Sequence, residues 1–229
     1  MKKRIVVLSL GGSLIIPENV NVNYLREFKK IILRNTKNCK FIIVCGGGSI
    51  ARKYISALRD IGINEKLQGL AGISATRTNA RFMNYFFNIE EERGIPHTIK
   101  NLRRRIRKKD IVFCGALEYK PKYTSDSTAA LIAKKFKTIF INLTNVDGMY
   151  NKDPTKYKDA KFIPSVSWKD FYRIANKAQF KPGQHFVLDQ SASRIIMKNK
   201  ITTYILGKRL GEFENLLRNK KFKGTTIQG

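Results

Sequence analysis

Two glycine-rich segments have the composition of loops that bind phosphate. The first is Leu10-Gly-Gly-Ser13, and the second is Cys45-Gly-Gly-Gly-Ser-Ile-Ala-Arg52. Glycine has no Cβ, so its backbone can approach phosphate oxygens closely, and the amides of a helix N-terminus attract negative charge. Arg52 would add a bidentate cation to the same anion. Either segment alone could be only a tight turn between a strand and a helix, but together they could hold a polyphosphate.

A third polar segment runs from Leu143 to Pro154 and reads LTNVDGMYNKDP. Its Asp-Gly and Asp-Pro pairs are turn signals, which by themselves indicate only a surface loop. Between them, Thr144 and Asn145 offer hydrogen bonds, and Tyr150 offers a flat face for a base. Neither glycine segment matches G-x-x-x-x-G-K-[ST] or G-x-G-x-x-G, so the familiar NTPase and dinucleotide folds lose their main support. We therefore expect a different kinase architecture.

Short apolar segments alternate with segments of helical spacing, which indicates parallel βαβ units in an α/β fold. We predict strands at 4–10, 40–45, 111–115, 138–143 and 201–206, and helices at 24–33, 49–61, 73–93, 125–136, 167–176 and 190–199. Gly94 would end the helix at 73–93, and Asp189 would cap the one at 190–199. Ligands of such sheets bind beyond the carboxyl ends of the strands, where the glycine segments fall. With no repeat or linker, residues 1–229 are expected to form a single domain.

Taken in order, these segments resemble the motifs of the amino acid kinase family. The resemblance also includes YTSDSTAA (123–130), ISATRTNA (73–80), KPGQHFVLD (181–189) and the final FKGTTI (222–227), so it covers essentially the whole chain. Within the family, the chain looks most similar to the UMP kinases of the archaeal type. The resemblance implies a three-layer αβα sandwich with a mainly parallel central sheet. It also implies ATP-dependent phosphorylation of UMP to UDP in pyrimidine nucleotide synthesis.

The same resemblance implies roles for individual residues, with UMP on the N-terminal side and ATP on the C-terminal side. ATP would be bound by Gly11, Gly12, Ser13, Gly48, Arg52, Thr144, Asn145, Tyr150 and Asp153. UMP would be bound by Gly47, Leu117, Tyr123, Thr124 and Ser125. Arg52 and Asp126 would be catalytic, with Asp126 organising the reacting phosphates and indirectly Mg²⁺, which the nucleotide rather than a protein metal site would mainly hold. On the residues alone, Asp126 could equally be an ordinary acid at the start of a helix.

The sequence departs from the family pattern at two positions. Ser9 stands two positions before the first Gly-Gly, where many members carry lysine. Archaeal-type UMP kinases often lack this lysine, so Ser9 argues mainly against acetylglutamate and isopentenyl phosphate kinases. Gly69 stands where the UMP kinase pattern has an aspartate that binds the nucleoside, and Gln68 could take over that contact. The alternatives are another small-molecule kinase of this fold with a changed acceptor pocket, or a non-catalytic nucleotide- or RNA-binding relative.

The chain is strongly basic, with 45 Lys and Arg against 17 Asp and Glu in 229 residues, which gives a net charge of +28. Such a charge attracts anionic partners but does not define a fold. The densest basic run is KNLRRRIRKK, from Lys100 to Lys109, and it contains no aromatic residue for stacking on bases. We expect this run to be a solvated connector between two strands that could make nonspecific contact with nucleic acid.

Three further expectations concern location and assembly. The three cysteines are widely spaced and form no CxxC pair, so neither a disulfide framework nor a zinc site is indicated, as is typical of a protein from a reducing cytoplasm. No apolar run approaches the roughly 20 residues needed to cross a bilayer, so a soluble, cytoplasmic protein without membrane contact is expected. The family resemblance implies a homo-oligomer, usually a hexamer.

Overall fold

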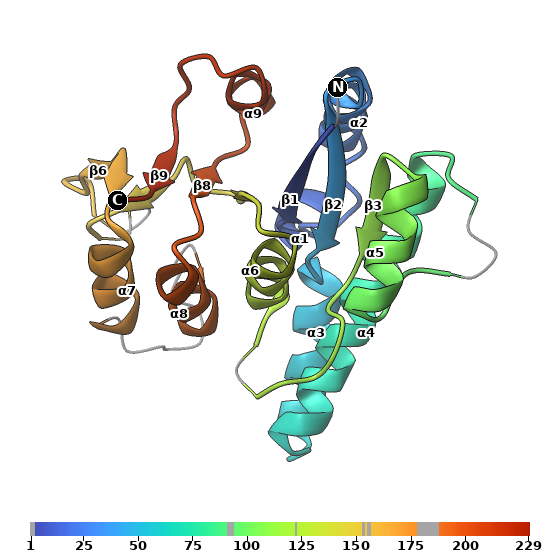
Figure 1. The fold of residues 1–229 in the computed structure, drawn as a ribbon. Helices are drawn as coiled ribbons and strands as arrows, with labels where there is room; N and C mark the ends of the chain where they lie inside the picture. The colour runs from blue at the N-terminus through green and yellow to red at the C-terminus, as the bar shows by residue number, and fades with distance from the viewer. Residues whose placement is uncertain (1–2, 91–93, 122, 153, 155–156, 178–187) are drawn as a thin grey trace.

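A computed structural model describes residues 3–90, 94–121, 123–152, 154, 157–177 and 188–229 (Figure 1). The strands are β1 (Arg4–Leu10), β2 (Cys39–Cys45), β3 (Ile111–Cys114), β4 (Phe140–Leu143), β5 (Met149–Tyr150), β6 (Phe162–Ile163), β7 (Ser165–Val166), β8 (Thr203–Leu206) and β9 (Thr225–Ile227). The helices are α1 (Gly12–Ile15), α2 (Val22–Asn35), α3 (Gly48–Asp60), α4 (Glu65–Phe86), α5 (Ile99–Lys108), α6 (Ser125–Phe136), α7 (Trp168–Lys177), α8 (Gln190–Asn199) and α9 (Leu210–Leu217).

The larger sheet has seven strands in the order β3-β2-β1-β4-β8-β9-β7. The pairs β1 with β2, β1 with β4, β2 with β3 and β4 with β8 are all parallel, whereas β9 runs antiparallel to β8. β5 and β6 form a separate two-stranded sheet. The mainly parallel sheet confirms the predicted α/β class. It also places the carboxyl ends of β1, β2 and β4 next to one another.

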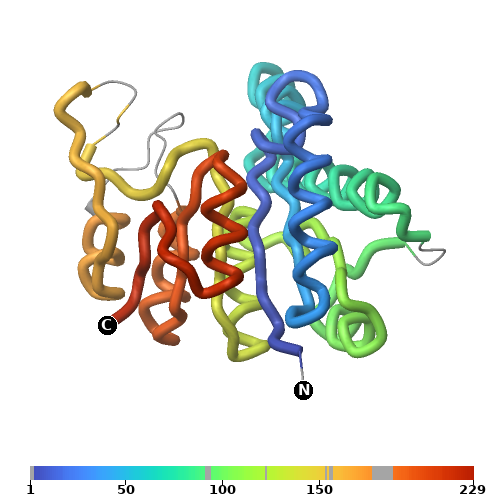
Figure 2. Tube along the Cα trace, turned by 90° about the horizontal axis from the view of Figure 1, so that it is seen from above, coloured from blue at the N-terminus to red at the C-terminus, as the bar shows by residue number. Residues whose placement is uncertain are grey.

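Helices cover both faces of the sheet, because its central strands bury side chains on both sides. In β1, Val6, Leu8 and Leu10 belong to one apolar cluster with residues of α2 and α9, while Val7 belongs to a second cluster with residues of α5, α6 and α8. Figure 2 shows α2 and α9 on the same side of the sheet. The arrangement is the expected three-layer sandwich, and a parallel sheet requires this double cover to bury its apolar strands.

Most predicted elements are confirmed, and two helices have the same bounds as expected. α6 spans Ser125–Phe136 and α8 spans Gln190–Asn199. The predicted cap of α8 is confirmed, because the carboxylate of Asp189 accepts a hydrogen bond of 2.8 Å from the amide of Ala192. The local capping signals in the sequence therefore located these helix starts correctly.

Two expectations about the middle of the chain are wrong. The helix predicted at 73–93 begins at Glu65, where the side chain of Asn64 caps it, and ends at Phe86, well before Gly94. The glycines at 69 and 72 hid its first two turns, because glycine is a poor helix former. The basic run Lys100 to Lys109 is not a plain connector: most of it forms the helix α5, capped by Thr98.

Candidate active site

The two glycine loops contact each other directly at the carboxyl ends of β1 and β2. A Cβ placed on Gly12 would lie 2.6 Å from Cα of Gly48 and 2.8 Å from the carbonyl carbon of Gly46. Both distances are far below van der Waals contact, so a side chain at this position would push the loops apart. The glycines are thus needed for the contact between the loops as well as for any approach of phosphate, and the loops form one continuous surface.

Two helices begin at this same edge of the sheet. α3 starts at Gly48, whose φ of +62° favours glycine, and α6 starts at Ser125. The end of β4 lies at the same edge, because the amide of Gly11 donates a hydrogen bond of 2.9 Å to the carbonyl of Leu143. The N-terminal ends of α3 and α6 carry partial positive charge, which favours an anionic ligand at this edge.

Asp126 lies in the first turn of α6 and faces β1. The hydroxyl of Ser9, which is fully buried, donates a hydrogen bond of 2.6 Å to one carboxylate oxygen of Asp126. The residue keeps some exposed surface, but protein surrounds its carboxyl group, and this burial raises the pKa of Asp126 from 3.8 to about 7. The negative charge of Asp189 adds to the rise in pKa, and the hydrogen bond from Ser9 opposes it.

Asp189, the predicted cap of α8, has further partners beside the candidate site. Its carboxylate accepts hydrogen bonds of 2.6 Å from the hydroxyls of Thr124 and Ser127, besides the amide bond that caps α8. It therefore fixes the start of α6 against the start of α8, next to Asp126. In the sequence, Asp189 stands just before a predicted helix and ends the segment KPGQHFVLD, and neither feature could reveal this contact between distant segments.

The segment between β3 and α6 is attached to α4 at its beginning. The guanidinium of Arg77 donates hydrogen bonds of 3.2 Å and 2.7 Å to the carbonyls of Ala116 and Leu117, and the hydroxyl of Thr76 accepts one of 3.0 Å from the amide of Ala116. Its other end is held by the bond from Thr124 to Asp189. This segment contains the residues expected at the UMP site, so both of its ends have defined positions.

Two of the expected UMP residues differ in their surroundings. Leu117 is buried, whereas Tyr123 is 37% exposed, with the ammonium of Lys120 5.6 Å from the centre of its ring. Gly47 lies against α3 and α4: a Cβ built on it would meet the side chain of Ala51, with that of Ala75 3.6 Å away. Gly47 is therefore confined by small side chains on both helices.

Gly69, where the family pattern has an aspartate, lies beside an aromatic ring. A Cβ on Gly69 would lie 2.6 Å from Cε2 of Tyr119, which belongs to the segment between β3 and α6. The tyrosine ring therefore occupies the direction in which a side chain at position 69 would point. Gln68 instead donates a hydrogen bond of 2.6 Å to the carbonyl of Ile63, in the connection that precedes α4.

Arg52 lies one turn into α3 and is 60% exposed. Its guanidinium donates a hydrogen bond of 3.0 Å to the carbonyl of Pro17 and lies 3.9 Å from a carboxylate oxygen of Glu18. Both partners belong to the segment after α1, so Arg52 links the two glycine loops from outside. The neighbouring Lys53 pairs with the same glutamate at 3.1 Å.

The segment after β4 contains the residues expected near the nucleoside of ATP. Thr144 continues from β4 and donates a hydrogen bond of 3.3 Å to the side-chain oxygen of Asn145. Tyr150 lies in β5, with its ring edge-on to that of Phe162 at 5.4 Å between centroids. Thr144 adjoins the first glycine loop, because its Cα would lie 3.7 Å from a Cβ on Gly11. Asp153 lies outside the described residues.

Neither a preformed metal centre nor a membrane span is found in the parts of the chain that the structure describes. Within those residues, no three His, Cys, Asp or Glu side chains are grouped so that they could hold a metal ion. No helix there is both long enough and apolar enough to cross a bilayer.

Comparison with known proteins agrees with this geometry. Residues 4–207 match the model of the amino acid kinase family. The fold, the order of the motifs and this match together show that the chain belongs to the amino acid kinase family.

The individual relatives are more specific. The chain is 34% identical over 224 residues to the uridylate kinase of Thermoplasma volcanium, covering 97% of both chains. It is also 34% identical to the uridylate kinase of Archaeoglobus fulgidus, again over 97% of both chains. The crystal structure of an Archaeoglobus fulgidus uridylate kinase superposes with a TM-score of 0.82 at 32% identity, covering 97% of this chain and 99% of that one. A UMP kinase structure from Ureaplasma parvum, at 20% identity and a TM-score of 0.81, shows the same fold.

Replacing Asp126 with asparagine tests the environment of this carboxyl group. Asparagine keeps the shape and can still accept the hydrogen bond from Ser9, but it cannot ionise. In the parent protein, the pKa of Asp126 is higher in the folded state than in the unfolded chain, so protonation of this group favours the folded state. This contribution to the free energy of unfolding is fully present below about pH 4 and is lost as the pH rises through about 7. Asp126→Asn should therefore gain stability relative to the parent by about 1 to 3 kcal/mol between pH 5 and pH 8.

Urea unfolding of both proteins at the two pH values measures this difference. Other titrating groups are common to both proteins and cancel in the comparison. Parallel pH dependences of the two unfolding free energies would show that the Asp126 carboxyl ionises normally.

Proposed function

We propose that this protein is a UMP kinase, which transfers the terminal phosphoryl group of ATP to UMP and releases UDP and ADP in pyrimidine nucleotide synthesis. The observation that carries the proposal is the position of Asp126. It lies in the first turn of α6, is hydrogen-bonded to Ser9 of β1, and stands at the edge of the sheet where the glycine loops meet. Relatives along the whole chain that are uridylate kinases support the choice of UMP. Both substrates would meet in the cytoplasm.

The geometry supplies what phosphoryl transfer needs. The acceptor is already a phosphate, so no strong general base is required, and catalysis depends on alignment and on stabilising the charge of the transferred group. The glycine loops and the starts of α3 and α6 present backbone dipoles to that charge. In this proposal Gly11, Gly12, Ser13 and Gly48 contact the phosphates of ATP.

The carboxylate of Asp126 suits Mg²⁺ that arrives with ATP. Oxygen ligands are the ones that Mg²⁺ prefers, and Mg²⁺ bridging the ATP phosphates would neutralise part of their charge. Among the described residues, no cation pairs with the carboxylate of Asp126, and burial together with the charge of Asp189 raises its pKa. Asp126 would then orient the nucleotide phosphates through the cation, while Ser9 and Asp189 fix the position of Asp126.

The proposed roles divide one domain, formed by residues 1–229, into two sides. On the ATP side, Thr144, Asn145, Tyr150 and Asp153 surround the nucleoside. On the UMP side, Gly47 and the segment from Leu117 to Ser125 bind the acceptor, with Thr124 and Ser125 nearest the site of transfer. The attachment of this segment to α4 through Arg77 supports the assignment, because an acceptor phosphate needs a fixed position.

One observation favours a second candidate, a kinase of the same fold with a different acceptor. At position 69 the chain has no carboxylate to bind a nucleoside, and the ring of Tyr119 lies against the glycine. An aromatic ring stacks on a base or covers an apolar group, whereas a carboxylate binds sugar hydroxyls. The acceptor pocket of this protein is therefore built differently from the pattern, and the acceptor must be measured directly.

Release of ADP in a coupled assay identifies the acceptor. With ATP and Mg²⁺ present, we expect rapid turnover with UMP and much slower turnover with CMP, AMP, GMP and non-nucleotide acceptors. Turnover only with a non-nucleotide acceptor would overturn the UMP assignment and support the second candidate. No turnover with any acceptor would favour a non-catalytic nucleotide-binding relative.

Arg52→Ala tests whether this arginine acts on the phosphates. The guanidinium can move from Glu18 to a bound anion because most of its surface is exposed. We expect kcat/KM for UMP phosphorylation to fall on the order of tenfold or more. Lys53→Ala is the matched control, since it removes an adjacent cation that pairs with the same glutamate, and it should change kcat/KM little. Equal effects of the two variants would remove Arg52 from the catalytic residues.

We also propose that the protein is a homo-oligomer, with a hexamer as the expected size. Exposed apolar side chains support association: Tyr54 is 54%, Ile61 73%, Leu67 47% and Leu70 38% exposed. All four come from α3, α4 and the turn between them, and Figure 1 shows these two helices side by side, extending beyond the sheet. Apolar side chains grouped in this way are typical of a protein interface.

Light scattering coupled to size-exclusion chromatography tests this proposal. The parent protein should have a mass several times that of one chain, and Leu67→Lys should lower it. Leu33→Lys is the matched control, because Leu33 is also 47% exposed but belongs to α2. A monomeric parent protein would contradict the proposal, and equal effects of both variants would contradict the assignment of the interface to α3 and α4.

A further inference from the structure

The outer face of α5 is a stripe of cations that the proposed kinase reaction does not use. Five exposed residues, Lys100, Arg103, Arg104, Arg107 and Lys108, recur at helical spacing on this face. The opposite face carries the buried Leu102 and Ile106, which fix α5 to the sheet. From its first to its last cation the stripe is about 12 Å long, at 1.5 Å per residue. We name these five residues the α5 stripe.

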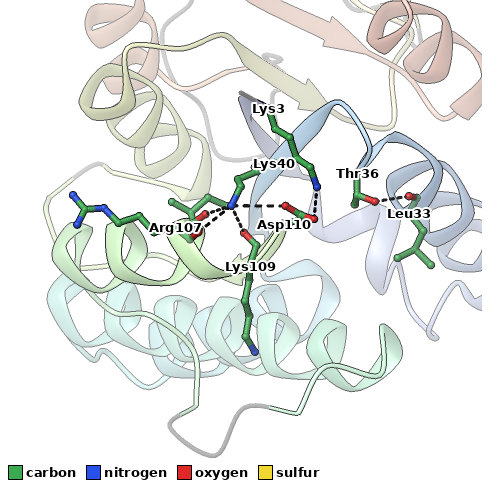
Figure 3. Close-up of polar contacts among 8 residues, drawn as sticks. Lys3, Leu33, Thr36, Lys40, Arg107, Lys109 and Asp110 are labelled. Carbon is green, nitrogen blue, oxygen red and sulfur yellow. Dashed lines mark hydrogen bonds and ion pairs between the residues drawn. The ribbon is translucent and has the colours of Figure 1, made fainter. Parts of the chain in front are cut away.

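The fold does not need most of these cations, because a lysine from outside α5, Lys40, donates hydrogen bonds to the free carbonyl groups at the C-terminal end of α5. The ammonium of Lys40 donates hydrogen bonds to the carbonyls of Ile106 and Arg107, at 2.8 Å and 3.1 Å, and Figure 3 shows Lys40 beside Arg107, Lys109 and Asp110. The nearby carboxylate of Asp110 is already engaged by Lys3 at 2.6 Å and by Lys40 at 3.7 Å. In the same figure, the guanidinium of Arg107 points away from this network.

Charge on the stripe is not balanced locally. Among the residues that the structure describes, no carboxylate pairs with a cation of the α5 stripe, although several cations elsewhere form ion pairs. α5 itself contains no acidic residue. Five cations on one helix repel one another, and this repulsion is relieved when an anion binds.

The stripe lines a hollow and continues onto a second helix. An open pocket of about 580 Å³ lies over the α5 stripe, and its lining residues, the five cations together with Ile99 and Asn101, all belong to α5. Arg103 donates a hydrogen bond of 2.7 Å to the carbonyl of Lys135 and lies over the ring of Phe136 at 5.2 Å. The end of α6 therefore adjoins the stripe, and it adds the exposed lysines 134, 135 and 137.

These features suit a repeating anion better than a single small one. The cations of the α5 stripe are spread over more than two helical turns of an open surface. A ligand with phosphates at regular intervals can therefore contact several of them at once. No aromatic side chain of α5 is available for stacking on bases, and Phe136 is covered by Arg103. Contact is thus expected with phosphates, which fix position but do not read sequence.

We propose that the α5 stripe and the adjoining end of α6 form a surface that binds the phosphate backbone of nucleic acid without base recognition. The surface uses none of the residues assigned to phosphoryl transfer, so it is a second activity and does not depend on the proposed kinase reaction. Binding should weaken steeply with added salt, because each neutralised phosphate releases counterions.

Fluorescence anisotropy with a labelled duplex of about 20 base pairs tests this proposal in the full-length protein. The variant is Lys100→Gln, Arg104→Gln, Arg107→Gln and Lys108→Gln together, which keeps Arg103 because of its packing role. We expect Kd to rise on the order of tenfold or more at low salt, and the slope of log Kd against log salt concentration to fall by about 2 to 4. Phosphoryl transfer should be unchanged, which also shows that the variant is folded.

The matched control removes the same charge from another helix. Arg26, Lys30 and Arg34 are exposed on α2, with Lys37 just beyond its end, and all four become glutamine. This control should change Kd by less than about threefold, since it alters only the long-range attraction of the whole protein. Equal losses in the two variants would overturn the proposal, because binding would then follow net charge and not the α5 stripe.

Two further outcomes would contradict the assignment. Displacement of the duplex by ATP or UTP at the same total phosphate concentration would show a site for free nucleotides instead of a polymer. An affinity that changes strongly with base sequence at constant length would show base recognition, which the stripe cannot provide. A parent protein with no measurable binding at low salt would overturn the proposal outright.

Discussion

The hydrogen bond from Ser9 to Asp126 joins the first strand of the sheet to the helix that carries the acid of the candidate site. The two residues are 117 positions apart in the sequence, the distance between the donor and acceptor oxygens is 2.6 Å, and Ser9 is fully buried. Without a stable β1, the carboxyl group of Asp126 would have no fixed partner, and without α6 the hydroxyl of Ser9 would be buried unsatisfied, which costs free energy. Because β1 pairs in parallel with both β2 and β4, the hydrogen bond between Ser9 and Asp126 lies at the edge of the sheet from which the glycine loops begin.

The glycine loops serve structure and chemistry through the same property. Gly12 and Gly46 lack Cβ atoms, and for that reason their backbones can touch. The contact brings the ends of β1 and β2 together, and the same bare backbone can then face an anion. A strand-to-helix turn and a phosphate site were alternatives for each segment by itself, but in the folded chain one close approach forms the turns and is also compatible with the proposed phosphate site.

The sequence predicted what local patterns determine and missed what contacts between distant segments determine. Apolar strands, the start of α6 at Ser125 and the cap of α8 at Asp189 follow from local signals, and all were located. The start of α4 was missed because its glycines weaken the helical pattern. That Asp189 also fixes Thr124, 65 residues away, could not be predicted, since nothing in the local sequence specifies this partner.

Ser9 also explains why Asp126 is electrostatically unusual. A lysine at this position would place a positive charge beside the carboxylate and hold its pKa low, whereas a hydroxyl supplies only one hydrogen bond against burial and the charge of Asp189. Burial and the charge of Asp189 thus disfavour the ionised form of Asp126, and a carboxyl group with a raised pKa is typical of functional sites. A cation carried in with a phosphate ligand would supply the missing charge. In the proposed reaction, the serine at position 9 therefore leaves part of the charge balance of Asp126 to the bound nucleotide and its cation.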